Sequence, residues 1–175
     1  MRNAKIDIRS IRVEEAKDYW ALRLEALQRN PVAFGAAYEE SVLLPIEEVE
    51  KRIGQGSSNY ILGAFTTEGQ LIGTVGFKRE QSLKLKHKAF IWGVYVSEKF
   101  RGQGIAKQLM AEVIRRGKQL EGLKQVTLSV VTTNKAAVEL YRKLGYETYG
   151  VEQNALEYEG QGYDEEMMVY MYKEQ

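Results

Sequence analysis

The sequence predicts a mixed α/β domain built around one central sheet. Segments whose apolar and polar residues alternate as in a β-strand are interspersed along the chain with segments whose apolar residues have the spacing of an amphipathic helix. One nearly continuous apolar stretch is followed directly by a short glycine-containing loop and a long helical pattern. No repeat or linker composition divides the 175 residues, so we expect a single domain over residues 1–175.

The first half of the chain predicts a strand, two helices and three further strands. Residues 5–13, KIDIRSIRV, alternate apolar and polar side chains, as a half-buried strand does. Residues 14–28 carry apolar side chains at helical spacing, and Asn30-Pro31 ends that pattern. The stretch PIEEVEKRI, which opens with Pro45, is typical of a second, shorter helix.

The central strands and the second half complete the pattern. Residues 59–80 predict two strands joined at Glu68-Gly69, and KAFIWGVYVSE (88–98) predicts a strand covered on both faces. The next helix should end near Gly122, and LKQVTLSVV (123–131) predicts another strand. A helix from a cap at Asn134 to Leu144 and a strand-like tail ending in EEMMVYMY then follow, with an acidic, glycine-containing loop before that ending. The order is β-α-α-β-β-β-α-β-α-β-β.

Composition excludes several classes of function. The chain has no cysteine and one histidine, His87, which argues against disulfides, thiolate nucleophiles, metal clusters and Ser-His-Asp relays. A net charge of +1 gives no general attraction to nucleic acid or to an anionic membrane, although lysines cluster locally around His87. No apolar stretch is long enough to span a bilayer, and MRNAKIDIRS lacks the apolar core of a signal peptide, so we expect a cytoplasmic protein.

The loop before the long helix predicts a phosphate-binding site. Gly102 and Gly104 precede a helix although glycine disfavours a helix interior by about 1 kcal/mol relative to alanine. Glycine allows the backbone to approach a bulky anion closely, and the first N–H groups of a helix attract phosphate oxygens. Arg101 adds a cation suited to phosphate. A tight strand-to-helix turn alone would also explain the glycines, and neither G-x-G-x-x-G nor G-K-[ST] is present.

Arg101-x-x-Gly104-x-Ala106, after the strand GVYVSEKF, resembles motif A of the GCN5-related N-acetyltransferase (GNAT) family, [RQ]-x-x-G-x-[GA]. The following stretch, LKQVTLSVVTTNKAAVELYRKLGYE, resembles the next strand and helix of that family. Its matching positions are Asn134, Ala137, Leu140, Tyr141, Gly145 and Tyr146. The order of elements also agrees over essentially the whole chain, which implies a GNAT-type mixed central sheet with helices on both faces.

The resemblance implies that acetyl-CoA is the cosubstrate and indicates which residues bind it. The strand before the loop carries a bulge in this family and pairs with pantetheine through its backbone. The positions to which the resemblance assigns cofactor binding are Val94, Tyr95, Val96, Arg101, Gly102, Gln103, Gly104, Ile105, Ala106, Asn134, Ala137 and Tyr141. Asn134 can equally be a plain helix cap, and the side chains of Val94 and Val96 are expected to pack in the core.

The chemistry of amine acetylation needs a base, an oxyanion donor and an acid. A strand N–H near Val96 could stabilise the oxyanion, and Tyr141 matches the family position of the acid that protonates the departing thiolate. The alternative for Tyr141 is an aromatic side chain packed beside its helical neighbours. The base is less defined: we select Glu40, while the other candidates are Glu39, Tyr95, Asp164, Glu165 and Glu166. Glu39 and Glu40 fall where the resemblance implies a substrate-facing loop between the two early helices. No glutamate lies within IWGVYV, where some members place their base.

The leading hypothesis is therefore an acetyl-CoA-dependent N-acetyltransferase that acts on a primary amine of a small molecule or peptide, by direct attack in a ternary complex. An alternative is a non-catalytic acyl-CoA-binding sensor, against which Tyr141 argues because binding alone needs no proton donor. A nucleotide-binding protein is a third, remote alternative. We expect no metal, no nucleic-acid partner and no membrane partner. The strand MMVYMY either completes the sheet or contributes to a homodimer, as is frequent in the family.

Overall fold

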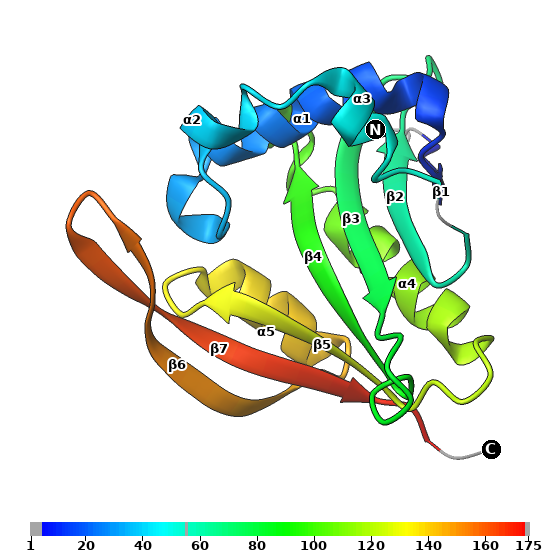
Figure 1. Ribbon diagram of the computed structural model, residues 1–175, viewed down its shortest axis with the longest axis vertical. Coiled ribbons are helices and arrows are strands. Elements are labelled where there is room, and N and C mark those ends of the chain that lie inside the picture. Colours follow the sequence, from blue (N-terminus) through cyan, green and yellow to red (C-terminus); the bar gives the residue numbers. More distant parts are fainter. Residues whose placement is uncertain (1–4, 55, 174–175) are drawn as a thin grey trace.

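The predicted fold class is confirmed by a computed structural model, which describes residues 5–54 and 56–173 (Figure 1). A seven-stranded mixed sheet has the order β1-β2-β3-β4-β5-β7-β6. The strands are β1 (Asp7–Ser10), β2 (Asn59–Phe65), β3 (Leu71–Arg79), β4 (Lys88–Val96), β5 (Gln125–Val131), β6 (Glu147–Tyr158) and β7 (Gln161–Met171). The helices are α1 (Ala16–Arg29), α2 (Tyr38–Ser41), α3 (Ile46–Glu50), α4 (Ile105–Lys118) and α5 (Lys135–Lys143), with short 3-10 turns η1 (Val13–Glu15), η2 (Pro31–Ala33) and η3 (Glu98–Phe100).

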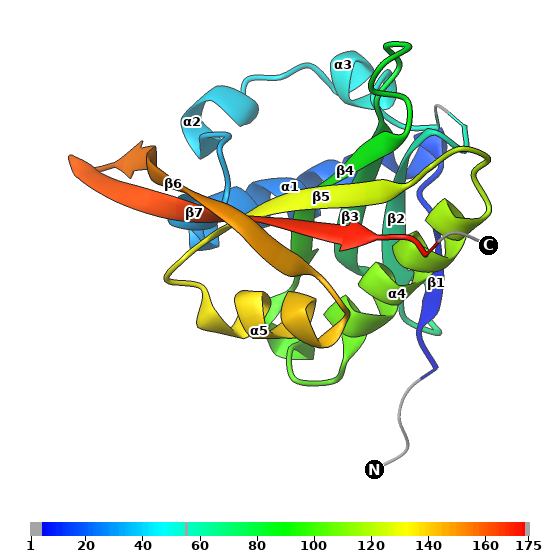
Figure 2. The ribbon, with the colours of Figure 1, turned by 90° about the horizontal axis from the view of Figure 1, so that it is seen from below.

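Helices cover both faces of the sheet, with α4 and α5 on one side and α1 to α3 on the other (Figure 2). Alternation along β2 explains this, because successive side chains of a strand point to opposite faces. Leu62 and Ala64 pack in the cluster that contains Leu109 of α4, whereas Ile61 and Phe65 pack with α1 and α3. The apolar faces that the sequence predicts for the helices and strands therefore pack together in two cores, one on each side of the sheet.

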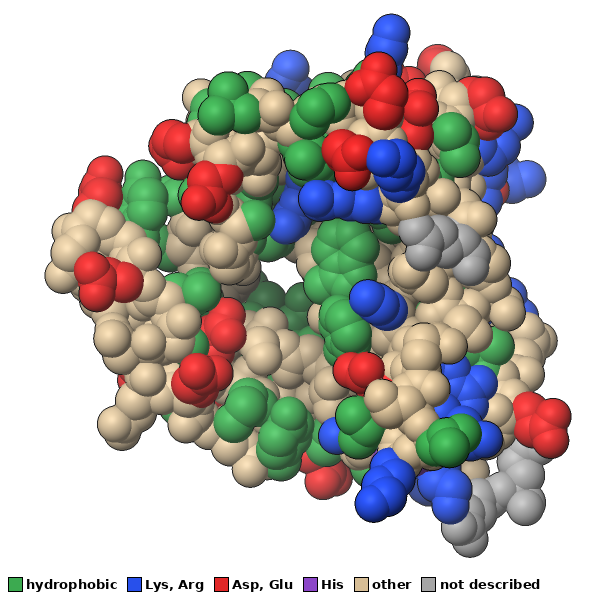
Figure 3. All heavy atoms as spheres, in the orientation of Figure 1, with side chains coloured by type: hydrophobic (Ala, Val, Ile, Leu, Met, Phe, Trp, Pro, Cys, Tyr) green, Lys and Arg blue, Asp and Glu red, His purple; other side chains and the backbone are tan. Residues whose placement is uncertain are grey.

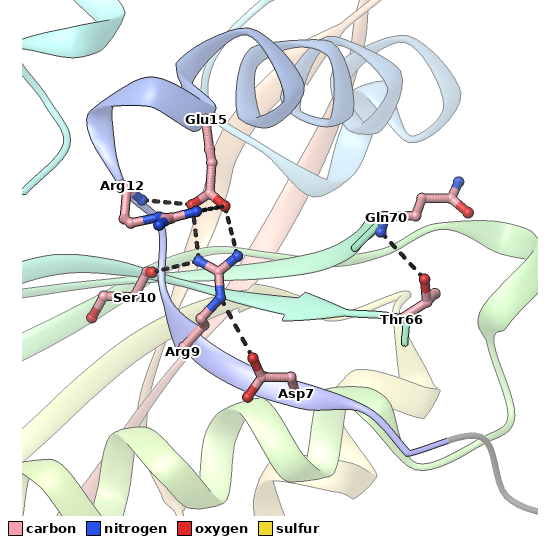
Figure 4. A network of polar contacts seen from close by, with 7 residues as sticks. All are labelled: Asp7, Arg9, Ser10, Arg12, Glu15, Thr66 and Gln70. Carbon is pink, nitrogen blue, oxygen red and sulfur yellow. Dashed lines mark hydrogen bonds and ion pairs between the residues drawn. The ribbon is translucent and has the colours of Figure 1, made fainter. Parts of the chain in front are cut away.

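A charged network fixes the junction between β1 and α1 (Figure 4). The Glu15 carboxylate accepts hydrogen bonds from the Arg9 guanidinium at 2.6 and 2.9 Å and from the Arg12 backbone N–H at 2.8 Å. The Arg9 guanidinium also lies 3.7 Å from the centre of the Phe65 ring. These bonds hold the pKa of Glu15 at about 2, chiefly through Arg9.

Two irregularities in β4 open the middle of the sheet. Thr74 of β3 lies opposite Tyr95 and Gly76 lies opposite Trp92, so two residues of β4 face one residue of β3 in a β-bulge. The first of these bulged residues, Gly93, has φ +61°, a conformation that favours glycine. On its other edge, β4 pairs in parallel with β5 only from Lys88 to Phe90. Beyond Phe90 the two strands diverge.

The element bounds differ from the sequence expectation in three places. The first strand covers only Asp7–Ser10, because the chain turns into η1 and begins α1 at Ala16. The loop expected between the early helices contains the short helix α2. The acidic stretch expected as a loop near the C-terminus instead forms β6 and the start of β7, which turn at Glu159 (φ 50°) and Gly160.

Among the described residues, no helix combines the length and apolar character that a bilayer span requires. Residues 1–4 of the N-terminal segment that we read for a signal peptide lie outside the described residues.

Candidate active site

A cavity of about 540 Å³ lies where β4 and β5 diverge. One wall is the segment from Arg29 to Phe34, and the others are the end of β4, the end of β5 and the first turns of α5. The surface is visibly hollowed between β4 and the side that carries α2 and the β6–β7 hairpin (Figure 3). The predicted site residues that line the cavity are Val94, Tyr95, Val96, Arg101, Ala106, Asn134, Ala137 and Tyr141.

A smaller hollow of about 160 Å³ continues this cavity toward the glycine loop. Gly102, Gly104 and Ile105 line it, and it shares Val96, Arg101, Ala106 and Leu140 with the main cavity. Gln103, which we also expected to bind the cofactor, is exposed and lines neither hollow. The predicted cradle is therefore continuous with the main cavity.

The glycine loop has the geometry of an anion site. Gly102 and Gly104 have φ of +75° and +76°, and a Cβ atom added at either would meet no atom within 4 Å. Gly104 is the N-cap of α4, so the unpaired N–H groups of the first turn point toward this loop. Such an opening fits the diphosphate of acetyl-CoA. The Arg101 side chain instead donates its Nε–H to the Val96 carbonyl at 3.0 Å, so it braces the loop against β4.

Asn134 caps α5, because its side-chain oxygen accepts the backbone N–H of Ala137 at 3.3 Å. The predicted helix cap is confirmed, and the same side chain lies at the cavity wall. Its role toward pantetheine stays a prediction.

Tyr141 lies on the buried face of α5 and reaches the cavity. It is 6% exposed, and no described residue forms a hydrogen bond with its hydroxyl. Burial raises the pKa of Tyr141 well above its usual range. The hydroxyl therefore stays protonated at neutral pH and is available to donate a proton into the cavity.

Tyr95 is held in place from behind the cavity. Its hydroxyl donates to Glu25 Oε1 at 2.9 Å, and the Ser97 hydroxyl donates to the same oxygen at 3.0 Å. Burial and the bond to Glu25 raise the pKa of Tyr95 to about 12. Tyr95 is therefore a positioning group for β4, and the structure does not present its hydroxyl as a base.

The candidate bases lie in different surroundings. Glu40 is exposed on α2 and does not line the cavity, while Glu39 lines a neighbouring hollow of about 370 Å³. In β7, Glu166 bonds to Arg142 and Thr148, and Asp164 accepts the Asn154 backbone N–H.

Glu165 differs from the other candidates. It pairs in register with Val131, whose side chain lines the cavity. Directly paired residues of adjacent strands present their side chains on the same face, so Glu165 is directed to the face on which Val131 lies. Burial, followed by repulsion from Glu152, raises the pKa of Glu165. Glu40, which we selected from the sequence, does not line the cavity that Tyr141 lines, and neither does Glu165. Glu165 nevertheless has the partial burial and the raised pKa expected of a base, whereas Glu40 is exposed.

Two residues beside the cavity, Arg23 and Phe34, were not predicted from the sequence. Phe34 lines the cavity and packs edge-on against Tyr95, and the Arg23 guanidinium lies against the Phe34 ring. A signal for Arg23 was present, because it is three residues after Trp20 and four before Leu27 on the apolar side of α1. In the described part of the chain, no cluster of three His, Asp or Glu side chains could hold a metal ion.

Comparison with known proteins agrees with this architecture. Residues 31–146 match the model of the acetyltransferase (GNAT) family. An uncharacterized N-acetyltransferase of Bacillus subtilis, YdgE, is 26% identical over 137 residues, which cover 76% of this chain and 86% of that protein.

Solved structures show the same fold. An acetyltransferase of the GNAT family from Streptococcus pneumoniae superposes with a TM-score of 0.84 at 24% identity, over 96% of this chain and 100% of that one. The acetyltransferase yncA from Salmonella typhimurium, solved with acetyl-CoA, gives 0.79 at 16% identity over 98% and 96% of the two chains. The bulged β4, its divergence from β5 and the glycine loop define an acyltransferase-type fold. The chain belongs to the GNAT acetyltransferase family, whose cosubstrate is acetyl-CoA.

Proposed function

We propose that this protein transfers the acetyl group of acetyl-CoA to a primary amine of a small molecule or peptide. The observation that carries the proposal is the cavity between β4 and β5, because Tyr141 lines it and the hollow of the glycine loop continues it. A protein that only binds acyl-CoA needs the glycine loop but has no use for a protonated tyrosine in the cavity wall.

The acceptor attacks directly in a ternary complex. The sequence has no cysteine to form a thioester with the enzyme. Its single histidine, His87, lies beside the closed end of β4 and β5, where its carbonyl accepts the N–H groups of Lys124 and Gln125. Neither residue type offers a covalent relay at the cavity, so the amine and acetyl-CoA have to meet there.

Each part of the cavity has a role in that complex. Bound acetyl-CoA supplies the reactive thioester. The backbone of Gly102 to Ala106 holds its diphosphate, and the unpaired edges of β4 and β5 bind the amide groups of its arm. Tyr141 donates a proton to the departing sulfur, which avoids expelling a free thiolate. Glu165 takes the proton of the amine, because its raised pKa suits a base better than the exposed Glu40 does.

Binding is tested first by thermal unfolding with acetyl-CoA, CoA or ATP. At 100 times its dissociation constant a ligand stabilises the folded state by about 2.7 kcal/mol, so acetyl-CoA and CoA should raise the melting temperature and ATP should not. Ala106→Glu places a carboxylate in the first turn of α4, where it repels the diphosphate and should abolish the shift. Ala111→Glu, exposed on the same helix, is the matched control and should keep it.

Thiol release over a panel of amines then separates an enzyme from a sensor. An enzyme releases CoA thiol in proportion to a productive amine, whereas a sensor shifts its melting temperature without release. The absence of any shift with both CoA species would contradict the proposal, and a shift without release for every amine would favour the sensor.

A further inference from the structure

Arg23 is a partly buried cation of α1 that lies against Phe34, a residue of the cavity wall. It projects from α1 toward the bulge in β4, where a Cβ atom at Gly93 would lie 3.4 Å from its Nη1. Its guanidinium carbon lies 4.8 Å from the centre of the Phe34 ring and 5.9 Å from the Trp92 ring. Because Phe34 lines the cavity, this guanidinium lies immediately behind that wall.

No described carboxylate neutralises Arg23. Its Nη1 is buried without a hydrogen-bond partner, and no ion pair to Arg23 forms within the described ranges. The nearby Glu25 is occupied by Tyr95 and Ser97. Another arginine, Arg52, is close enough to oppose its charge, and burial lowers the pKa of Arg23. A partly buried cation with no counter-ion is unfavourable for folding, so a compensating anion is expected from outside the chain.

The surroundings of Arg23 select the kind of anion. A guanidinium presents a planar fork of N–H donors that matches the two oxygens of a carboxylate. The Phe34 and Trp92 rings lie close enough for cation–π contacts with that fork and limit where it can point. Lys and Arg side chains lie along the upper edge of the hollow in the space-filling view, and acidic side chains lie across from them (Figure 3). A ligand with an anionic and a cationic end fits this polarity.

We propose that Arg23 binds a carboxylate of the acceptor, so that the acceptor is an amino acid or a related amine that carries a carboxylate. This inference rests on the proposed acetyltransferase function and names the substrate class of the same site. It excludes polyamines, whose second cation would face an unpaired guanidinium. Arg23 does not itself line the cavity, so the carboxylate would reach it beside Phe34, with the amine end in the cavity that Tyr141 lines.

The test compares L-amino acids with their primary amides, at saturating acetyl-CoA, by thiol release. The two members of a pair share the side chain and the amine but differ in the carboxylate that Arg23 is proposed to bind. Because the amide also has the lower amine pKa, each kcat/KM is expressed per neutral amine. A charge-assisted hydrogen bond strengthens binding roughly 10- to 100-fold, so kcat/KM of the wild type should be higher for the acid than for the amide by that factor. In Arg23→Met the acid and the amide should come within about threefold of each other, mainly because KM for the acid rises.

Arg52→Met is the matched control. Arg52 is an exposed arginine of the same region whose guanidinium lies 6.0 Å from the Trp20 ring. This variant should keep the preference for the acid. A structural role for Arg23 would instead lower the rates for acids and amides equally and would lower the melting temperature. Arg23→Lys keeps the charge without the fork, and it should retain part of the preference.

The two proposals fail in distinguishable ways. The role of Arg23 would be overturned if the wild type had equal kcat/KM for acids and amides. It would also be overturned if the preference for the acid were unchanged in Arg23→Met. Either result would leave the acetyltransferase proposal intact. Calorimetric titration of the CoA-saturated wild type with an N-acetyl amino acid and its amide gives a readout without turnover. Tighter binding of the acid by roughly 10-fold or more is expected, and equal binding would overturn the inference.

Discussion

Arginines just before α1 and in the middle of α1 have opposite surroundings. At its start, Arg9 and Arg12 pair with Glu15, and Arg9 also pairs with Asp7, so the network contains two cations and two anions. Two turns further on, Arg23 is partly buried beside aromatic rings and has no described carboxylate to bind. The arginines of the first region have their counter-ions within the protein, whereas Arg23 would gain one only from a bound ligand. Satisfied groups are expected to determine stability, and unsatisfied groups at the cavity are expected to determine activity.

The same contrast separates the tyrosines. Tyr95 donates to Glu25, whereas the Tyr141 hydroxyl has no described partner and reaches the cavity. Tyr146 has a buried hydroxyl without a partner, and its ring lies 6.0 Å from that of Tyr141, yet it does not line the cavity. This trio makes the comparison testable with substitutions that each remove one hydroxyl.

The largest expected effect is that of Tyr141→Phe on turnover. Loss of the proton donor should lower kcat by about 100-fold or more, while the melting temperature shift with acetyl-CoA is retained. Steady-state thiol release measures the first quantity and thermal unfolding the second. Tyr146→Phe is the control and should stay within about threefold of the wild type. Equal rates for the two variants would show that the unpartnered hydroxyl at the cavity is not the acid.

Glu165→Gln should lower kcat by roughly 100-fold, because it removes the base. Only the deprotonated carboxylate accepts a proton, so the activity of the wild type should rise with pH through the Glu165 pKa, which is raised from 4.5. That ascending limb should disappear in the variant. The exposed Glu40 provides the comparison: a larger loss in Glu40→Gln than in Glu165→Gln would restore the sequence-based choice of base.

Glu15→Gln tests the satisfied region and should act on stability alone. At pH 7 we expect it to lower the free energy of unfolding by about 1–2 kcal/mol, because Arg9 loses its counter-ion. The carboxyl pKa falls from 4.5 to about 2 on folding, so its contribution is complete above pH 4.5 and is lost as the pH falls toward 2. Urea unfolding between pH 7 and pH 3 measures both effects. Glu14→Gln, exposed and adjacent, is the control and should change neither.

Tyr95→Phe should have the smallest effect, a loss of about 1 kcal/mol in unfolding free energy, since one hydrogen bond to Glu25 disappears. Folding raises the Tyr95 pKa to about 12, so this group stabilises the fold fully below pH 10 and loses that contribution as the pH rises toward 12. Chemical unfolding at pH 8 and pH 11 checks the sign. A fall in kcat as large as that of Tyr141→Phe would place the Tyr95 hydroxyl in the chemistry.

Features that depend on local sequence were predictable. The alternation in β2, the glycine loop before α4 and the Asn134 cap follow from periodicity and from backbone chemistry within a few residues. The strand β6 was harder to predict because it is largely exposed, so its sequence carries little alternation between apolar and polar residues.

The acceptor side could not be predicted, because it depends on segments far apart in the sequence. The position of Arg23 beside Gly93 follows from how α1 crosses β4, which no local pattern encodes. The same is true of Glu165, whose register with Val131 directs it to the face of the sheet on which Val131 lies. The sequence predicted Glu40 in a substrate-facing loop, but in the structure Glu40 belongs to the short helix α2 and its side chain is exposed.

The short parallel ladder between Lys88–Phe90 and Gln125–Thr127 makes the sheet two half-sheets joined at one corner. A ligand lying between the free edges would act as an eighth strand, and its hydrogen bonds to both edges would join the two half-sheets. Amide protons on both sides of the gap, from Ile91 in β4 and from Leu128 in β5, should then become slow to exchange together. The corner itself should exchange at the same rate with and without acetyl-CoA, because its hydrogen bonds are already made.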